Sequence, residues 1–152
     1  MKRTTSIIAL VFSLLLAACG DEEKIGVSYL GLNHTDKSIV SVIVNDEGGV
    51  LDVSAHGGGG KIVCCVMLPR KWKPGLTATI KWQNDGDWLL DAKGKEVIRN
   101  GKRVYVPAPW KERTVEVPKY EAMGEFYIVF FPNDEVKVAV SNGIPDVAKA
   151  PR

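Results

Sequence analysis

The chain has 152 residues, a formal net charge of +2, 45% hydrophobic residues and 25% charged residues. These values fit one globular domain and exclude a collagen-like chain, a largely disordered chain and a polytopic membrane protein. Three cysteines are too few for a disulfide-stapled scaffold, and the charge is far below that of a typical nucleic-acid-binding domain.

The N-terminal eighteen residues have the pattern of a secretory signal. Two basic residues precede an apolar stretch from Ile7 to Leu16, which as a helix spans about 15 Å, roughly half of a bilayer core. The stretch ends in Leu-Ala-Ala-Cys, which resembles the lipobox of bacterial lipoproteins, in which the cysteine is lipidated and becomes the new N-terminus. We therefore expect a signal peptide over residues 1–18 and a lipid anchor, with palmitate among its acyl chains, on Cys19.

Removal of this leader changes the charge of the chain. Residues 19–152 carry 18 basic and 18 acidic residues, so their formal charge is zero. A neutral domain has no general attraction to nucleic acid or to an anionic membrane, so we expect membrane association through the anchor alone. Gly20 after the cysteine resembles a sorting signal for the outer membrane, periplasmic face, rather than for the inner membrane. Residues 19–25 would form a lipidated tether.

Residues 26–142 show short apolar or alternating runs separated by turn residues. Leu76 to Trp82 alternates strictly, which predicts a half-buried strand, and Pro132 to Glu135 predicts a hairpin connection. Without a sustained helical period, seven or eight short strands predict an all-β fold, an antiparallel β-sandwich of which the immunoglobulin-like arrangement is one form. Residues 143–152 contain two prolines and are expected to form a flexible C-terminal tail. The strand-like runs are 27–32, 38–44, 61–68, 76–82, 114–117, 126–131 and 136–140, with shorter candidates at 50–53 and 104–106.

The run from Ile62 to Leu68 is apolar on both faces, whereas a sandwich strand normally leaves one face in water. We expect residues 83–113 to cover the second face, with a partner protein as the alternative cover. Cys64 and Cys65 lie within this run and would point to opposite faces of a regular strand. We expect them to be two buried thiols that act as small hydrophobes, with a vicinal or an intermolecular disulfide as alternatives.

The Gly-rich segment does not carry a catalytic motif. His56 followed by Gly57 to Gly60 resembles the oxyanion loop of esterases, but no G-x-S-x-G elbow accompanies it. Lys61 is followed by Ile62, where a phosphate-binding loop needs a hydroxyl. The segment is better explained as a loop without side chains that another backbone can approach closely.

Three aspartates, Asp85, Asp87 and Asp91, do not have the spacing of an EF-hand calcium loop. An Asn-Asp-Gly turn at residues 84–86 is the simpler explanation. Because no nucleophile, general base or ligand set is visible, we expect no enzymatic activity, no cofactor and no metal site.

Two segments place tryptophan among cations. These are Arg70 to Lys73 and Trp110 to Arg113, which are typical of solvated loops over a packed tryptophan or of protein-binding hot spots. Together with the Gly-rich loop, they give the predicted partner-binding residues. This set consists of Gly58, Gly59, Arg70, Trp72 and Trp110.

One stretch, His56 to Trp82, carries a Gly-rich loop, the run CCVMLPRKW from Cys64 to Trp72, and a Pro-Gly-Leu turn at residues 74–76. It resembles a family of small bacterial lipoproteins classed as a domain of unknown function, and residues 32–37 and 114–118 also look similar. Members are similar to proteins encoded beside lipase effectors of type VI secretion. The resemblance implies an immunity protein that binds and neutralises a cognate phospholipase by occlusion. The alternative is a non-enzymatic structural or assembly lipoprotein of the envelope.

Overall fold

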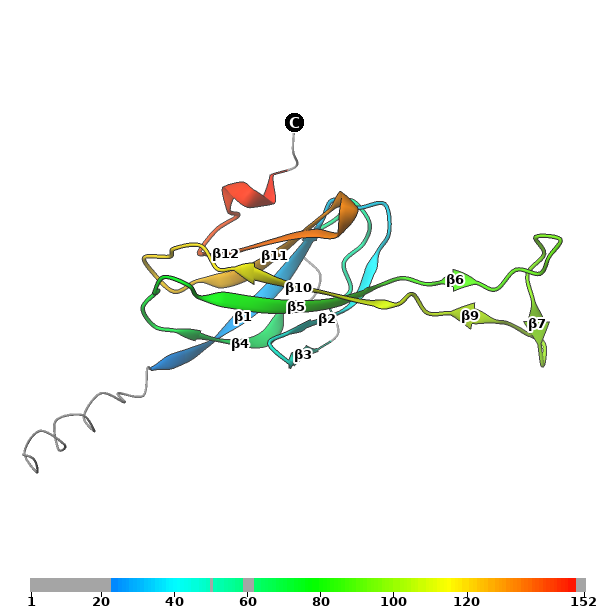
Figure 1. Ribbon diagram of the computed structural model, residues 1–152, viewed down its shortest axis with the longest axis horizontal. Helices are drawn as coiled ribbons and strands as arrows, with labels where there is room; N and C mark the ends of the chain where they lie inside the picture. Colours follow the sequence, from blue (N-terminus) through cyan, green and yellow to red (C-terminus); the bar gives the residue numbers. More distant parts are fainter. Residues whose placement is uncertain (1–22, 50, 59–61, 150–152) are drawn as a thin grey trace, which may run out of the picture.

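A computed structural model describes residues 23–49, 51–58 and 62–149 (Figure 1). Two four-stranded sheets pack face to face in this part of the chain, which confirms the predicted all-β sandwich. One sheet has the order β12-β11-β1-β4 and the other has the order β10-β5-β2-β3. The first consists of β1 (Lys24–Asn33), β4 (Val63–Pro69), β11 (Glu125–Phe131) and β12 (Glu135–Ser141). The second consists of β2 (Ile39–Val44), β3 (Glu47–Gly49), β5 (Thr77–Asn84) and β10 (Trp110–Glu116).

Neighbouring strands of these two sheets pair antiparallel, with the exception of β1 and β11, which pair parallel with Tyr29 opposite Phe126. The sandwich is therefore not purely antiparallel as predicted. Parallel neighbours need a long crossover connection, and here most of the chain separates β1 from β11. This non-local pairing leaves no local pattern in the sequence.

The core forms where the inner faces of the two sheets meet. In β5 the side chains of Ala78, Ile80 and Trp82 are buried in alternation with half-exposed or exposed neighbours, which confirms the predicted half-buried strand. The Trp82 ring lies 5.7 Å from that of Phe130 in the opposite sheet. Burial of each large side chain of this kind stabilises the fold by about 1.5–3 kcal/mol.

The strand β11 is buried on both faces because the C-terminal segment covers its outer side. Val129 and Phe131 pack with Ala148 of the short 3-10 helix η2 (Asp146–Ala148). His34 stacks on the Phe131 ring, and its Nε2 lies 3.0 Å from the Ala148 carbonyl oxygen. The segment predicted to be a flexible tail thus contains a short 3-10 helix whose Ala148 packs on β11. Residues 150–152 lie outside the described residues.

The connection between β11 and β12 is the 3-10 turn η1 (Pro132–Asp134), which confirms the predicted hairpin. Asn133 and Asp134 have φ angles of 63° and 59°, in the left-handed region that Asn and Asp tolerate best among residues with a Cβ. No helix in the described part of the chain has the length and the apolar character that crossing a bilayer would require.

The strand β4 does not match its prediction. Most of the predicted cover, residues 85–109, projects away from the sandwich between β5 and β10, so it does not cover the outer face of β4, which is an edge strand of its sheet. Met67 is 42% exposed, Cys64 is exposed and Cys65 is half-buried, so the prediction of two buried thiols is wrong. The two cysteines are joined in a vicinal disulfide, one of the alternatives, and the peptide bond between them is cis.

Candidate functional site

A long arm, residues 85–109, leaves the sandwich where β5 ends and returns where β10 begins (Figure 1). Trp88 pairs with Tyr105 and Asp87 pairs with Val106 along its two sides. The predicted turn at residues 84–86 is wrong, because the chain runs on without reversing. A Cβ at Gly86 would collide with the Val106 carbonyl oxygen, so glycine is required there for close approach of the returning chain. The arm contains β6 (Asp87–Trp88), β7 (Ile98–Arg99), β8 (Lys102–Arg103) and β9 (Tyr105–Val106).

Polar contacts hold the base of the arm. The Tyr105 hydroxyl donates to Asp85 Oδ1 at 2.7 Å and accepts the Gly86 N–H at 2.7 Å. The hydrogen bond to Asp85 raises the pKa of Tyr105 above its ordinary value. Asp87 forms an ion pair with Lys37 of the sandwich at 3.0 Å. Two of the three aspartates that could have suggested a calcium loop, Asp85 and Asp87, therefore hold the base of the arm instead.

The arm forks at a ring of three backbone hydrogen bonds. Leu89 N–H donates to the Val104 carbonyl at 2.8 Å, Val104 N–H to the Val97 carbonyl at 3.0 Å, and Val97 N–H to the Leu89 carbonyl at 2.8 Å. All three residues are half-buried although they lie far from the main core. The ring therefore gives the end of the arm an ordered support of its own. We call residues 90–103, which lie beyond Leu89 and Val104, the tip, and the remainder of the arm the stem.

The tip consists of two short hairpins that diverge from this ring (Figure 1). In the first, Asp91 Oδ1 accepts the N–H groups of Lys93 and Lys95 at 2.8 and 2.9 Å. In the second, Asn100 and Gly101 have φ angles of 50° and 74°, as the two central residues of a type I′ turn require. The Asn-Gly pair is a strong local hairpin signal, and it could have revealed this element from the sequence.

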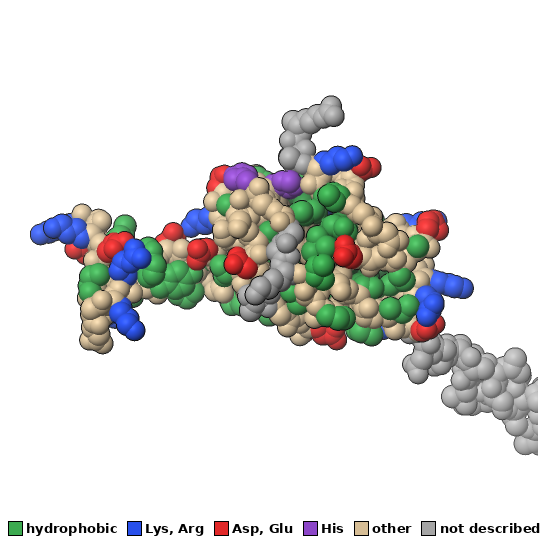
Figure 2. All heavy atoms as spheres, turned by 180° about the vertical axis from the view of Figure 1, so that it is seen from behind, with side chains coloured by type: hydrophobic (Ala, Val, Ile, Leu, Met, Phe, Trp, Pro, Cys, Tyr) green, Lys and Arg blue, Asp and Glu red, His purple; other side chains and the backbone are tan. Residues whose placement is uncertain are grey.

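Large apolar side chains are exposed along the arm. Six of the nine exposed large hydrophobic residues in the described part of the chain lie between positions 88 and 110, and Figure 2 shows hydrophobic side chains along the arm. These six are Trp88, Leu90, Ile98, Tyr105, Val106 and Trp110, each 42–55% exposed. A cluster of exposed apolar side chains of this kind is typical of a surface that contacts another molecule.

The tip is also strongly basic. It contains five Lys or Arg residues and two acidic residues, while the rest of residues 19–152 has thirteen basic and sixteen acidic residues. Arg103 pairs with Glu96 at 3.2 Å. The other four cations of the tip form no ion pair with any residue that the structure describes, and Lys and Arg side chains extend from the far end of the arm in Figure 2. These four are Lys93, Lys95, Arg99 and Lys102.

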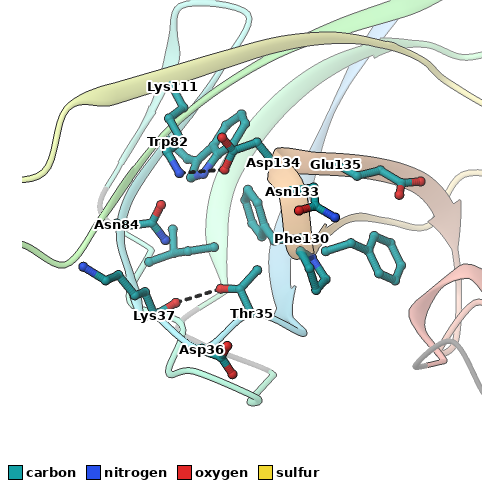
Figure 3. A pocket seen from close by; sticks show the side chains of 13 residues that line it. Thr35, Asp36, Lys37, Trp82, Asn84, Lys111, Phe130, Asn133, Asp134 and Glu135 are labelled. Atoms are coloured by element: carbon teal, nitrogen blue, oxygen red, sulfur yellow. Dashed lines mark hydrogen bonds and ion pairs between the residues drawn. The ribbon is translucent and has the colours of Figure 1, made fainter.

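A small hollow of about 160 Å³ lies beside the base of the arm (Figure 3). Thr35 and Lys37 border it on one side, and the β11–β12 connection borders it on the other. Lys111 Nζ forms an ion pair with Asp134 Oδ1 at 2.6 Å inside this border. The other charged residues of the lining, Asp36, Lys37 and Glu135, form ion pairs with neighbours outside the hollow, so we assign the hollow no chemistry.

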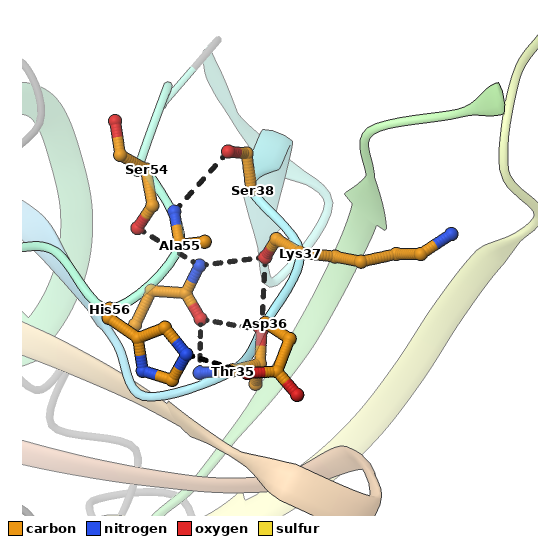
Figure 4. Close-up of polar contacts among 8 residues, drawn as sticks. Thr35, Asp36, Lys37, Ser38, Ser54, Ala55 and His56 are labelled. Carbon is orange, nitrogen blue, oxygen red and sulfur yellow. Dashed lines mark hydrogen bonds and ion pairs between the residues drawn. The ribbon is translucent and has the colours of Figure 1, made fainter.

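The loops beside this hollow are held by Asn33, whose side chain is fully buried. Its Oδ1 accepts the Thr35 N–H at 2.9 Å and the Thr35 hydroxyl at 2.7 Å. Its Nδ2 lies within hydrogen-bond distance of the carbonyls of Lys37, Val53 and Ser54 at 2.9–3.3 Å. Figure 4 shows polar contacts that join the segment from Thr35 to Ser38 to the segment from Ser54 to His56. The side chain thereby fixes the end of the sandwich from which the arm projects.

The predicted partner-binding residues do not form one surface. Trp110 opens β10 at the base of the arm and is 51% exposed. Trp72 lies beyond the opposite end of β10, where its Nε1 donates to the Val117 carbonyl at 2.8 Å and its ring packs against the core. The length of β10, seven residues, separates these ends by about 20 Å. Arg70 is also at the far end, where it pairs with Glu23 at 2.8 Å.

Gly58 lies at the same end of the sandwich as the arm, paired with Leu32 near the end of β1. Gly59 and Cys19 lie outside the described residues. Within residues 23–49, 51–58 and 62–149, no group of three or more His, Cys, Asp or Glu side chains is arranged to hold a metal ion. The sequence therefore identified one residue at the base of the arm, Trp110, and missed the arm itself.

The fold and this site define an all-β sandwich domain with a projecting arm. Residues 32–138 match the family DUF3304, described as a protein of unknown function, and the chain belongs to this family. The matched range includes the whole arm and most of both sheets. Neither the curated proteins nor the solved structures gave a match.

Proposed function

We propose that the chain is a lipoprotein of the outer membrane that faces the periplasm and acts as an immunity protein. In this proposal it binds a phospholipase effector of type VI secretion and neutralises it by occlusion, without catalysis of its own. The signal peptide, the lipobox at Cys19 and the family resemblance of the sequence support the location and the class of partner. The arm, with its exposed aromatic residues, is the single structural observation that carries the binding role.

The construction of the arm suits protein recognition. Trp88 and Tyr105 expose large amphipathic rings, and such residues dominate the binding energy of many protein interfaces. The ring of hydrogen bonds at Leu89, Val97 and Val104 orders the arm before binding. A preordered surface binds more tightly than a flexible one because less conformational entropy is lost on association.

The position of the arm agrees with an anchored inhibitor. Lys24 begins β1 at one end of the sandwich, and the arm projects from the opposite end (Figure 1). Cys19 precedes Lys24 by five residues, which can span at most about 18 Å. A lipid on Cys19 would therefore keep the sandwich near the membrane with the arm directed away from it. Anchoring also raises the local concentration of the inhibitor at the surface under attack.

The test is co-purification of the full chain with the product of an adjoining lipase-type gene, followed by a phospholipase assay. We expect binding and inhibition by the unaltered chain. A matched variant replaces residues 90–103 by Asn-Gly, which closes a two-residue hairpin between Leu89 and Val104. We expect this shortened arm to lose inhibition while the sandwich keeps its unfolding temperature.

One outcome would overturn the proposal, and another would overturn only the role of the tip. Absence of both binding and inhibition by the unaltered chain would favour the structural or assembly lipoprotein. Full inhibition by the chain with the shortened arm would show that the chain is an inhibitor but that its tip is not needed for inhibition.

A further inference from the structure

We infer that the tip docks on an acidic surface of the protein partner, with Lys93, Lys95, Arg99 and Lys102 as the selective contacts. This inference rests on the proposed binding function and adds the chemistry of the partner. It starts from the distribution of charge. The tip has a formal charge of +3 and the rest of residues 19–152 has a formal charge of −3. The net charge is therefore zero, but positive charge is concentrated in the tip.

Ion pairs within the chain increase this difference in charge between the sandwich and the tip. Many cations on the sandwich are neutralised by their own neighbours, for example Lys37 by Asp87, Lys81 by Asp46 and Lys111 by Asp134. Four of the five cations of the tip, all except Arg103, have no ion-pair partner among the described residues. Unneutralised charges gathered on one protruding element attract an oppositely charged partner and speed its association.

The cations are held in place by ordered backbone. Lys93 and Lys95 lie in the turn that Asp91 caps, and Arg99 and Lys102 flank the Asn100-Gly101 turn. The tip also exposes Leu90 and Ile98, which are 54% and 55% accessible. Apolar side chains within a charged periphery are the usual arrangement of a protein interface, whose centre is apolar and whose rim is polar.

An anionic lipid surface has the same charge as an acidic protein, but it fits the arm less well. The stem carries Asp85 and Asp87 next to its exposed aromatic rings, so insertion of those rings into an anionic bilayer would bring carboxylates to a surface that repels them. The tip also lies at the opposite end of the molecule from Lys24, near which the anchor would hold the chain (Figure 1). Both observations favour a protein partner.

The experiment compares two charge reversals of equal size in the chain from Gly20 onward, which contains every described residue. One variant combines Lys93→Glu with Lys102→Glu, one position from each hairpin of the tip. The matched control combines Lys24→Glu with Lys71→Glu, two exposed residues at the other end of the sandwich. The probe is the product of the adjoining lipase-type gene, and association rates are measured at low and high ionic strength.

We expect the tip variant to associate about tenfold or more slowly at low ionic strength, with a smaller difference at high salt. The control should stay within about twofold of the unaltered chain. Equal rates for all three chains would overturn the acidic-surface inference and leave the proposed function standing. Failure of the unaltered chain to bind at all would instead overturn the proposed function, and the inference with it.

A second part of the experiment measures sedimentation with vesicles of phosphatidylglycerol and phosphatidylethanolamine. We expect neither the unaltered chain nor the tip variant to sediment with them. If the unaltered chain sediments and the tip variant does not, while both bind the protein probe equally, the tip recognises lipid and the inference is wrong. Equal unfolding temperatures of the variants would show that the substitutions act on binding rather than on folding.

Discussion

Arg103 lies over the indole ring of Trp88, with its guanidinium carbon 4.2 Å from the ring centroid. The same indole meets the Tyr105 ring edge-on, at 5.6 Å between centroids. Trp88 thus links the tip, which contains Arg103, to the stem, which contains Tyr105. The exposed aromatic surface of the arm is therefore also part of what holds the arm in shape.

Substitution of Trp88 should loosen the arm without unfolding the sandwich. Trp88→Ala removes the cation–π contact with Arg103, and exposed contacts of this kind contribute about 0.5–1 kcal/mol. We expect faster hydrogen exchange of the Leu89 amide, which donates to the Val104 carbonyl, and an unchanged global unfolding temperature. An equal loss of protection in β5 and β11 would show that the arm and the core unfold together, against this expectation.

The base of the arm should depend on pH through Tyr105. Its hydroxyl donates to Asp85, which raises the pKa of the phenol above the usual value near 10. Because the folded state holds this proton more tightly than the unfolded state, the contact contributes stability below about pH 10 and loses it as the pH rises through the raised pKa. Ultraviolet absorption of tyrosinate in the unaltered chain and in Tyr105→Phe measures this titration. A difference spectrum that titrates at or below the ordinary value would contradict it.

Trp72 should prove to be a structural residue. Trp72→Phe keeps an aromatic ring in the core but removes the hydrogen bond to the Val117 carbonyl, at a cost of about 1 kcal/mol in the free energy of unfolding. Arg70→Ala removes an exposed ion pair with Glu23 and should cost less than about 1 kcal/mol. Chemical denaturation measures both values. Neither substitution should alter binding of the effector, since both residues lie at the end away from the arm. A clear loss of binding would instead show that the substituted residue belongs to the contact surface.

Asn33 should tolerate little change. Asn33→Asp has nearly the same shape, but its side chain would bring a carboxylate against the carbonyls of Lys37, Val53 and Ser54 that Nδ2 now contacts. Unsatisfied carbonyls and a buried charge together should lower the free energy of unfolding by about 3 kcal/mol. Thermal denaturation across pH provides the test. The loss should shrink at low pH, where the introduced carboxyl is protonated; a loss of stability independent of pH would point to another cause.

The vicinal disulfide has a direct mass signature. Intact-mass measurement without reduction should give one chain lighter by two hydrogen atoms than the reduced chain, without a disulfide-linked dimer. Cys64→Ser combined with Cys65→Ser serves as the control and should show no change on reduction. A fully reduced monomer, or a dimer that reduction separates, would contradict the pairing.

Sequence patterns predicted those strands and turns of the sandwich that depend on residues close together in the chain. The alternation of Leu76 to Trp82 predicts a half-buried strand because successive side chains of a strand point to opposite faces, and β5 has this burial. The residues Pro132 to Glu135 predict a hairpin because of their turn preferences, and they join β11 to β12. The Asn100-Gly101 pair offered a signal of the same kind for the tip.

What the sequence by itself determined is therefore the class of fold and several of its strands and turns. The tertiary structure decided which strands neighbour one another, and this placed β4 at an edge, exposed Cys64 and separated Trp72 from Trp110. It also decided that the chain runs on from β5 to β6 through Gly86 rather than turning, because Gly86 meets Val106, twenty residues further along the chain. Contacts between distant segments are selected by the packing of the whole chain, and no local period or turn motif encodes them.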